Sequence, residues 1–356
     1  MPQPAERKFD VAVVGATGAV GEVLLELLAE RNFPVGRLAV LASARSAGQQ
    51  VRFGKRSLSV VDLEDFDFAG VDFAFFSAGG SVSAAHAPRA AAAGATVIDN
   101  TSHFRMHDDV PLVVPEVNRN VIAGGYGPDV SGGIIANPNC STIQMLLAVA
   151  PIHRRFGVTR INVATYQAVS GAGRRAMDEL GRQTADKLNF RDPTVEVLSA
   201  PIAFNVIPRI DVIEPGGYTR EELKMHFETR KILGDDRIGV NATAVRVPVF
   251  YGHSEAVHLE TEEPFELDEA RGLLERAEGV RVIEGECDPM PLVDASGRDE
   301  VLVGRIRRDM THENGLDLWV VSDNLRKGAA LNAVQIGEFL VARCVAEPGG
   351  QGAALR

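Results

Sequence analysis

The sequence has 356 residues, of which 45% are hydrophobic and 24% are charged. This balance is typical of a globular protein long enough for two domains, and it excludes a disordered or fibrous chain. The net charge of -11 repels phosphodiester backbones and anionic lipid headgroups. We therefore expect neither a nucleic acid nor a membrane as a partner.

The cysteines and the first residues indicate the compartment. Cys140, Cys287 and Cys344 are far apart and form no CxxC motif, which favours a reducing environment. The opening residues lack the apolar core of a signal peptide, and no later apolar run is long enough to cross a bilayer. We therefore expect a cytoplasmic protein.

The first third of the chain alternates short apolar runs with helical periodicity. Buried strands that alternate with helices predict parallel βαβ units and a Rossmann-type doubly wound sheet. The expected strands are 9–15, 38–43, 71–77, 95–99, 111–114 and 132–136, and the expected helices are 19–31 and 82–93.

From about residue 140 the strands become longer and partly alternating, which predicts an α+β domain with a mixed, largely antiparallel sheet. The expected helices are 141–155, 172–188, 219–232 and 267–278, and the expected strands are 158–169, 240–250, 256–262, 279–284, 300–307 and 316–322. We assign a dinucleotide-binding domain to 1–138, completed by the C-terminal helix 326–346, and a second domain to 139–325. Residues 347–356 are expected to be a flexible tail.

A glycine-rich turn, GATGAVG at 15–21, joins the first strand to the first helix. Glycines there allow a tight turn and close approach of a pyrophosphate to the helix N-terminus, while Gly21 allows helix and strand to pack closely. The spacing is GxxGxxG and not GxGxxG, so a plain tight turn is the alternative. The predicted cofactor contacts in this turn are Gly15, Thr17, Gly18, Ala19 and Val20.

The end of the second strand indicates which dinucleotide is bound. A site specific for NAD usually has an acid there to hold the ribose 2′-hydroxyl, whereas this chain has Ser43, Arg45 and Ser46. A guanidinium and two hydroxyls suit a 2′-phosphate, so NADP is the predicted cofactor; the alternative is a polar loop with a solvated arginine. Ser77 and Gly79 end the third strand at the same sheet edge, where ligands bind.

Cys140 follows the last predicted strand of the first domain and directly precedes a long apolar helix. Unpaired N–H groups at a helix N-terminus lower the pKa of a thiol and favour the nucleophilic thiolate. The alternative is a small core residue. Polar neighbours and the position between the two domains favour a nucleophile.

A thiolate that attacks a carbonyl group needs an acid/base partner, and His253, just past a Gly turn between two strands, is a candidate. A loop histidine with a purely structural hydrogen bond is the alternative. His103 and His107 have the spacing of helical metal ligands but no acid–cysteine cluster nearby, so we expect no metal.

Five segments together resemble aspartate-β-semialdehyde dehydrogenases along nearly the whole chain: GATGAVG at 15–21, SARSAG at 43–48, SHFR at 102–105, NPNCST at 137–142 and RVPVFYGHS at 246–254. The resemblance implies NADPH-dependent reduction of L-aspartyl-4-phosphate to L-aspartate-4-semialdehyde and phosphate through a cysteine thioester. This reaction belongs to lysine, threonine, methionine and diaminopimelate biosynthesis. It also implies that 139–325 is a catalytic and dimerisation domain of a homodimer or homotetramer.

The resemblance implies a role for each matching residue. Cys140 would be the nucleophile, His253 the general acid/base and Gln167 the group that orients the substrate. Arg246 would hold the substrate carboxylate, Glu221 its ammonium group, and Lys224 with Arg105 the phosphate. Asn139 and Gly171 would also contact substrate, and Asn324 would lie near the nicotinamide.

Two alternatives remain at this point. An N-acetyl-γ-glutamyl-phosphate reductase uses the same chemistry, but an acetylated nitrogen needs no acid such as Glu221. A non-catalytic nucleotide sensor would keep the sheet and the Gly turn, but it has no use for a cysteine at a helix N-terminus.

Overall fold

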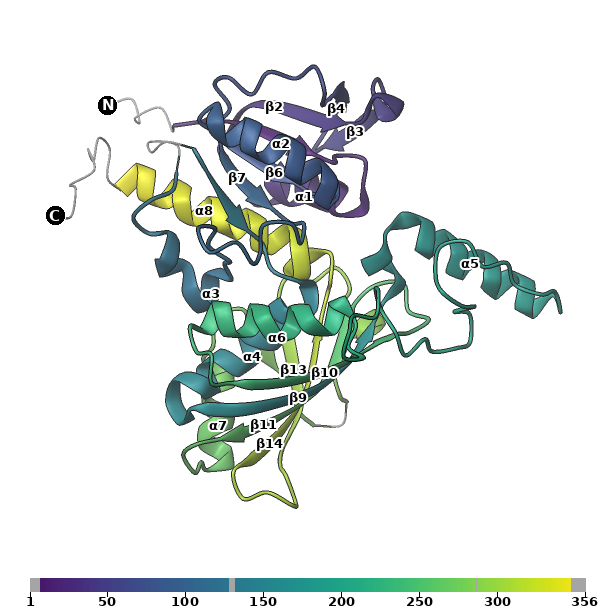
Figure 1. Ribbon diagram of the computed structural model, residues 1–356, viewed down its shortest axis with the longest axis vertical. Helices are drawn as coiled ribbons and strands as arrows, with labels where there is room; N and C mark the ends of the chain where they lie inside the picture. Colours follow the sequence, from purple (N-terminus) through teal and green to yellow (C-terminus); the bar gives the residue numbers. More distant parts are fainter. Residues whose placement is uncertain (1–6, 128–131, 286, 347–356) are drawn as a thin grey trace. The chain divides into compact units, whose positions relative to one another are not determined.

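The computed structural model describes residues 7–127, 132–285 and 287–346. The chain forms two compact units (Figure 1). Unit 1 contains the residues up to Pro138 together with those from Ala330 onward, and unit 2 is Asn139–Ala329. No helix among the described residues combines the length and hydropathy needed to cross a bilayer.

Unit 1 is built on a six-stranded parallel sheet in the order β5-β2-β1-β6-β7-β8. The predicted doubly wound fold is confirmed. Its strands are β1 (Phe9–Val14), β2 (Val35–Ala42), β5 (Val61–Asp62), β6 (Phe73–Phe76), β7 (Thr96–Asp99) and β8 (Gly133–Ala136), with a separate hairpin of β3 (Gln50–Phe53) and β4 (Arg56–Ser59). Its helices are α1 (Ala19–Glu30), α2 (Gly80–Ala92), α3 (Pro115–Asn118) and α8 (Leu331–Ala346).

The core of unit 1 uses both ends of the chain. Leu24 and Leu28 of α1 share one apolar cluster with Leu331 and Val334 of α8 and with Phe75 of β6. The Arg31 guanidinium and the Glu338 carboxylate join α1 to α8 at 2.8 Å. The last helix therefore completes the domain that the first strand begins.

Unit 2 has a six-stranded mixed sheet in the order β10-β9-β11-β14-β13-β12, in which the two outer pairs are parallel and the inner pairs antiparallel. Its strands are β9 (Val158–Gln167), β10 (Gly239–Arg246), β11 (His253–Thr261), β12 (Val280–Val282), β13 (Val301–Arg308) and β14 (Gly315–Ser322). Its helices are α4 (Cys140–Phe156), α5 (Arg174–Leu188), α6 (Arg220–Leu233) and α7 (Leu267–Glu275). The predicted mixed sheet is confirmed.

The almost wholly buried helix α4 packs on this sheet and contacts β9, β11, β13 and β14. Along most of β9, and along β11 from Glu255 onward, buried residues alternate with more exposed ones, as expected for strands with one covered face. This packing places the start of α4 beside the carboxyl end of β9 and the start of β11.

The expected strand at 111–114 is wrong. Only a single bridge joins Leu112 to Ala136, because the Val114 N–H donates to the Asn118 side chain at 2.9 Å and Pro115 begins α3. The hairpin of β3 and β4 was not predicted, and α8 begins at Leu331 after a π-type turn at Arg326–Ala330. The expected tail at 347–356 lies outside the described residues.

Candidate active site

The glycine-rich turn of unit 1 has the close packing that its sequence predicts. A Cβ on Gly21 would lie 2.1 Å from the Gly15 carbonyl oxygen, and one on Gly15 would lie 2.9 Å from the Ala78 nitrogen. Gly15 has a φ of 87°, which disfavours residues with a side chain. Gly18 precedes the first turn of α1, and Val20 packs against the core of the unit.

The turn lies where the strand order reverses, since β2 lies on one side of β1 and β6 on the other. Ser77 and Gly79 follow β6 at this edge, and the Ser77 hydroxyl donates to the Val14 carbonyl at 3.2 Å. In open α/β sheets, nucleotides bind in the crevice at such a point. In the first turn, the N–H groups of Gly15 and Ala16 donate to the Leu41 carbonyl oxygen, which fixes the turn against the end of β2.

Arg45 and Ser46 lie in a single 3-10 turn, Ala44–Ser46, directly after β2. Ser43 and Arg45 are exposed and Ser46 is half-buried. Arg45 makes no hydrogen bond or ion pair within the described parts of the chain. Its guanidinium is therefore available to an external anion.

Arg105 is the remaining predicted site residue of unit 1. It is 7% exposed, and its guanidinium donates to the backbone oxygens of Asn137 at 2.9 Å and Asn100 at 2.8 Å. The side chain is thus held in one orientation by two strand-end loops.

In unit 2, α4 begins at Cys140 with Asn139 as its N-cap. The Asn139 Oδ1 accepts from the backbone N–H groups of Ser141 at 3.0 Å and Thr142 at 3.4 Å, and the Glu228 carboxylate accepts from the Asn139 N–H at 2.7 Å. The predicted position of Cys140 at a helix N-terminus is confirmed. No disulfide joins the three cysteines, all of which are described.

Gly328 packs directly against Cys140, because a Cβ at position 328 would lie 2.9 Å from the Cys140 Cβ. This glycine is not among the predicted site residues. Its place after Ser322–Asn324, in a Gly-containing run before a helix, is the only signal that points to it.

His253 is the first residue of β11 and is fully buried. Its Nδ1 accepts from the Ala168 N–H at 3.0 Å, which places the proton of the neutral ring on Nε2. Burial, together with the Arg246 charge, lowers the His253 pKa to about 3, against the opposing effects of Glu221 and the Gly252 backbone. Within the described residues, Nε2 has no hydrogen-bond partner.

Arg246 ends β10 and approaches His253 across Gly171. A Cβ on Gly171 would lie 3.0 Å from Arg246 Nη1 and 3.3 Å from His253 Nε2, and Nη1 donates to the Ala168 carbonyl at 2.7 Å. Burial lowers the Arg246 pKa, while the charges of Glu221 and Cys140 oppose this shift. Arg246, His253, Gly171 and Cys140 therefore belong to one site.

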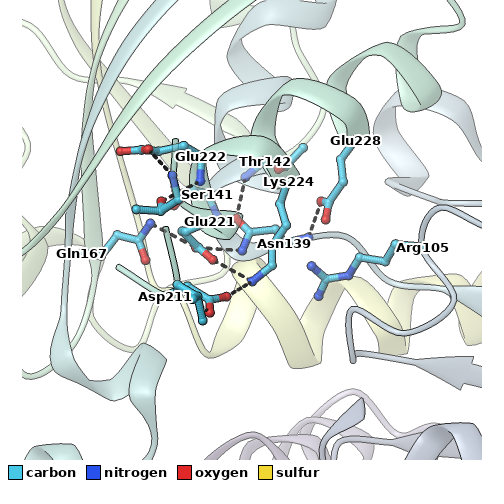
Figure 2. Close-up of polar contacts among 12 residues, drawn as sticks. Arg105, Asn139, Ser141, Thr142, Gln167, Asp211, Glu221, Glu222, Lys224 and Glu228 are labelled. Carbon is cyan, nitrogen blue, oxygen red and sulfur yellow. Dashed lines mark hydrogen bonds and ion pairs between the residues drawn. The ribbon is translucent and has the colours of Figure 1, made fainter. Parts of the chain in front are cut away.

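Figure 2 shows Glu221, from the first turn of α6, among Asn139, Gln167 and Lys224. Its Oε1 accepts from the Asn139 amide at 2.9 Å and the Gln167 amide at 3.2 Å, and its Oε2 accepts from Lys224 Nζ at 3.0 Å. Burial alone would raise the Glu221 pKa, but the Lys224 charge and these hydrogen bonds lower it to about 2. Glu221 is therefore ionised at neutral pH.

Lys224 Nζ also donates to Asp211 Oδ2, at 3.1 Å. Against burial, its two carboxylate partners raise the Lys224 pKa, so it stays cationic. An ammonium group has three donors, and two are used within the described residues. Asp211 lies in the irregular segment between α5 and α6, where no sequence pattern indicates it.

Asn324 is buried in unit 2. Its Oδ1 accepts from the Gly252 N–H at 2.9 Å, and its amide nitrogen lies 3.0 Å from the Ser170 hydroxyl. Asn324 thus joins the two loops that carry His253 and Gly171. Within the described residues, no group of three or more His, Cys, Asp or Glu side chains could hold a metal ion.

Comparison with known proteins decides the family. The semialdehyde dehydrogenase NAD binding domain matches residues 10–125, and the semialdehyde dehydrogenase dimerisation domain matches residues 149–327. The aspartate-semialdehyde dehydrogenase of Legionella pneumophila is 56% identical over 341 residues, which are 94% of this chain and 96% of that protein. The chain belongs to the aspartate-semialdehyde dehydrogenase family.

Solved structures of aspartate-semialdehyde dehydrogenases have the same fold. The second Vibrio cholerae enzyme, in a complex with ASA, has a TM-score of 0.91 at 54% identity, covering 94% of this chain and 99% of that chain. The Candida albicans enzyme with NADP has a TM-score of 0.74 at 26% identity, covering 95% and 100%. The resemblance inferred from the five segments is confirmed, and neither alternative function is favoured.

Proposed function

We propose that the chain reduces L-aspartyl-4-phosphate to L-aspartate-4-semialdehyde and phosphate with NADPH, through a thioester on Cys140. The observation that carries the proposal is that an arginine and a neutral histidine meet beside Gly171, and that the helix-terminal Cys140 interacts electrostatically with the same arginine. Membership of the aspartate-semialdehyde dehydrogenase family supplies the reaction class.

The first step is attack of the Cys140 sulfur on the acyl carbonyl carbon. The S–C bond forms, the bond from that carbon to the phosphate oxygen breaks, and phosphate leaves. The thiolate needs charge stabilisation, which the start of α4 and the nearby Arg246 guanidinium provide.

His253 acts on the oxygen of the former acyl group. Its Nε2–H points toward the space beside Gly171 and can donate to an oxyanion that develops there. When bound, a reduced nicotinamide would supply the hydride that turns the thioester on Cys140 into a thiohemiacetal oxyanion. With the His253 Nε2–H donating to this oxygen, the C–S bond breaks and releases the aldehyde and the Cys140 thiolate, so His253 acts as the acid that stabilises the oxyanion.

The charged groups of the site suit an aspartyl substrate. Arg246 can hold the α-carboxylate by two parallel N–H bonds, and the ionised Glu221 can accept a bond from the α-ammonium group. Lys224, which retains one donor, and Arg105 are the proposed phosphate contacts. Gln167, Asn139 and Gly171 complete the substrate site.

The turns of unit 1 fit a dinucleotide, because Gly15 and Gly21 let strand, turn and helix pack closely at the point where the strand order reverses. We assign cofactor contacts to the turn residues Gly15, Thr17, Gly18, Ala19 and Val20, to Ser43, Arg45 and Ser46 beside the adenosine ribose, to Ser77 and Gly79, and to Asn324. The absence of an acid after β2 favours NADPH over NADH.

A homodimer formed through unit 2 is also proposed. The segment that includes the end of α5 and the loop after it exposes several large apolar side chains: Leu188, Phe190, Phe204, Val206, Val212 and Ile213. Exposed apolar surface of this kind marks interaction sites. A second copy of the chain is the expected partner, because residues 149–327 match a dimerisation domain.

The decisive assay measures the phosphate-dependent reduction of NADP⁺. It compares two substrates, L-aspartate-4-semialdehyde and N-acetyl-L-glutamate semialdehyde. We expect turnover with the first aldehyde, dependent on phosphate. Turnover with the acetylated aldehyde alone, or with neither, would reject the proposed substrate.

Arg45→Ala is expected to lower kcat/KM with NADPH roughly ten- to a hundredfold and to change kcat/KM with NADH little. A charge-assisted hydrogen bond contributes about 1.5–3 kcal/mol, and Arg45 is available to bond the 2′-phosphate. Arg37→Ala, near the opposite end of β2, is the matched control and should leave both values unchanged. Equal losses with the two cofactors would mean that Arg45 only supports its loop.

Lys224→Gln is expected to raise the KM for phosphate in the oxidative direction more than the KM for the semialdehyde, because it removes a cation that retains a donor. Arg105→Gln should have the same signature. Lys231→Gln, further along α6, is the control. If only the semialdehyde KM rises, these cations hold the carboxylate, and the roles of Arg105 and Arg246 are exchanged.

A further inference from the structure

Glu255 is a buried acid that the proposed reaction does not use. It is the third residue of β11, two positions after His253, and it is fully buried. Residues two apart on a strand share a face, so Glu255 and His253 both lie on the side of the sheet that α4 covers. Its direct neighbours across the sheet are Thr165 on β9 and Val320 on β14.

The first turn of α4 supplies the polar neighbours of Glu255. Ser141 follows Cys140, and Gln144 lies one turn further. Burial raises the Glu255 pKa well above the ordinary value, and the nearness of these two polar side chains opposes that effect in part. The Gln144 amide also reaches the His253 carbonyl oxygen, at 3.5 Å. Gln144 therefore lies between the strand of the histidine and the helix of the cysteine.

A count of donors and acceptors shows what this cluster lacks. The Ser141 hydroxyl, Gln144 Oε1 and both Glu255 oxygens are buried, and none has a well-formed hydrogen bond within the described residues. If Glu255 were ionised, both of its oxygens and Gln144 Oε1 would be acceptors, and the Ser141 hydroxyl and the Gln144 amide would be the donors available to them. A proton on Glu255 adds a donor that Gln144 Oε1 can accept.

No cation replaces that proton. The residues that face Glu255 from α4, β9 and β14 are Ser141, Gln144, Thr165 and Val320, all uncharged, and His253 on its own strand is neutral. No described Lys or Arg forms an ion pair with Glu255. Burying an unpaired carboxylate is far more costly than burying a neutral acid.

We propose that Glu255 is a neutral carboxylic acid that links the first turn of α4 to the start of β11, and that it thereby positions Cys140 relative to His253. Ser141 donates to the acid, the acid donates to Gln144, and Gln144 donates to the His253 carbonyl oxygen. Glu255 is a positioning residue, since it acts through the two elements and does not contact the substrate. This role rests on the proposed function of Cys140 and His253.

The test compares Glu255→Gln, which keeps a neutral group with donor and acceptor, with Glu255→Met, which keeps the length and removes both. We expect Glu255→Gln to retain kcat within about threefold and Glu255→Met to lower kcat more than about tenfold with little change in the KM for semialdehyde. Glu260→Gln, on the same strand but half-buried, is the matched control. If Glu255→Met fails to fold, Ser141→Ala removes the first donor of the chain and should lower kcat in the same way.

Two readouts do not depend on turnover. The infrared spectrum of the wild-type protein at neutral pH should contain a carboxylic-acid C=O band that is absent from Glu255→Gln, because exposed carboxyls are ionised there. Alkylation of Cys140 by iodoacetamide should slow in Glu255→Met and not in Glu255→Gln. Absence of the band, equal losses of kcat in the two variants, or full activity of Glu255→Met would overturn the proposal. A wild-type protein that shows the band but has no activity would instead reject the proposed function.

Discussion

Replacing Cys140 by alanine is expected to abolish turnover while leaving the fold and NADPH binding intact. The substitution removes the sulfur that forms the thioester, and little packing is lost because Cys140 is only partly buried. The Asn139 cap, which stabilises the start of α4, is unaffected. Single-turnover assays, thermal unfolding and cofactor fluorescence would measure the three properties.

Chemical labelling checks the same assignment in the unmodified protein. An alkylating substrate mimic should label Cys140 faster than Cys287 or Cys344, although Cys287 is the most exposed of the three. Cys287→Ala and Cys344→Ala are the control variants and should retain activity. Comparable labelling rates at all three thiols would exclude Cys140 as the activated nucleophile.

His253→Gln is expected to lower kcat by about 10²- to 10⁴-fold, the usual contribution of a general acid/base, with a much smaller change in the KM for semialdehyde. The variant loses the Nε2–H that faces Gly171, while Cys140 and the substrate cations remain. Steady-state kinetics in both directions would measure the effect. Retention of more than a tenth of the activity would assign the proton transfer to another group.

The same variant gives a pH-dependent test of the buried imidazole. The pKa of His253 is about 3 in the folded protein and about 6.5 in the unfolded chain, so between these values the unfolded state binds more protons. Stability therefore falls as the pH is lowered through this window, by at most about 1.4 kcal/mol per pH unit. The stability difference between wild type and His253→Gln should shift against the wild type from pH 7 to pH 5 in urea unfolding, and a constant difference would contradict a buried neutral histidine.

Local patterns were sufficient for most of the fold. The apolar periodicity of 19–31 and the buried strand at 9–15 predict α1 and β1 to within one residue, because their burial follows the spacing of apolar side chains. The hairpin at 50–59 was missed, since its strands have four residues each and are mostly exposed. In such strands the apolar alternation is too short to be informative.

Only the site residues that lie in recognisable sequence motifs could be predicted. Asn139 and Cys140 precede an apolar helix, so a cysteine at a helix N-terminus could be inferred from sequence order alone. Glu255 could not, because an acid in an alternating strand normally faces solvent, and its burial depends on the packing of α4 over β11. Gly328 likewise depends on a contact with Cys140, which is distant in the sequence, and Asp211 lies in an irregular segment that brings it to Lys224 without any local pattern.

The place of α8 in unit 1 has a consequence for biosynthesis. Because Leu331 and Val334 belong to the same apolar cluster as α1, the nucleotide-binding unit lacks part of its core until the ribosome has synthesised α8. Unit 2, Asn139–Ala329, is continuous in sequence and complete earlier. The order of synthesis thus allows unit 2 to fold first, while the apolar surface of α1 stays uncovered until α8 has been synthesised.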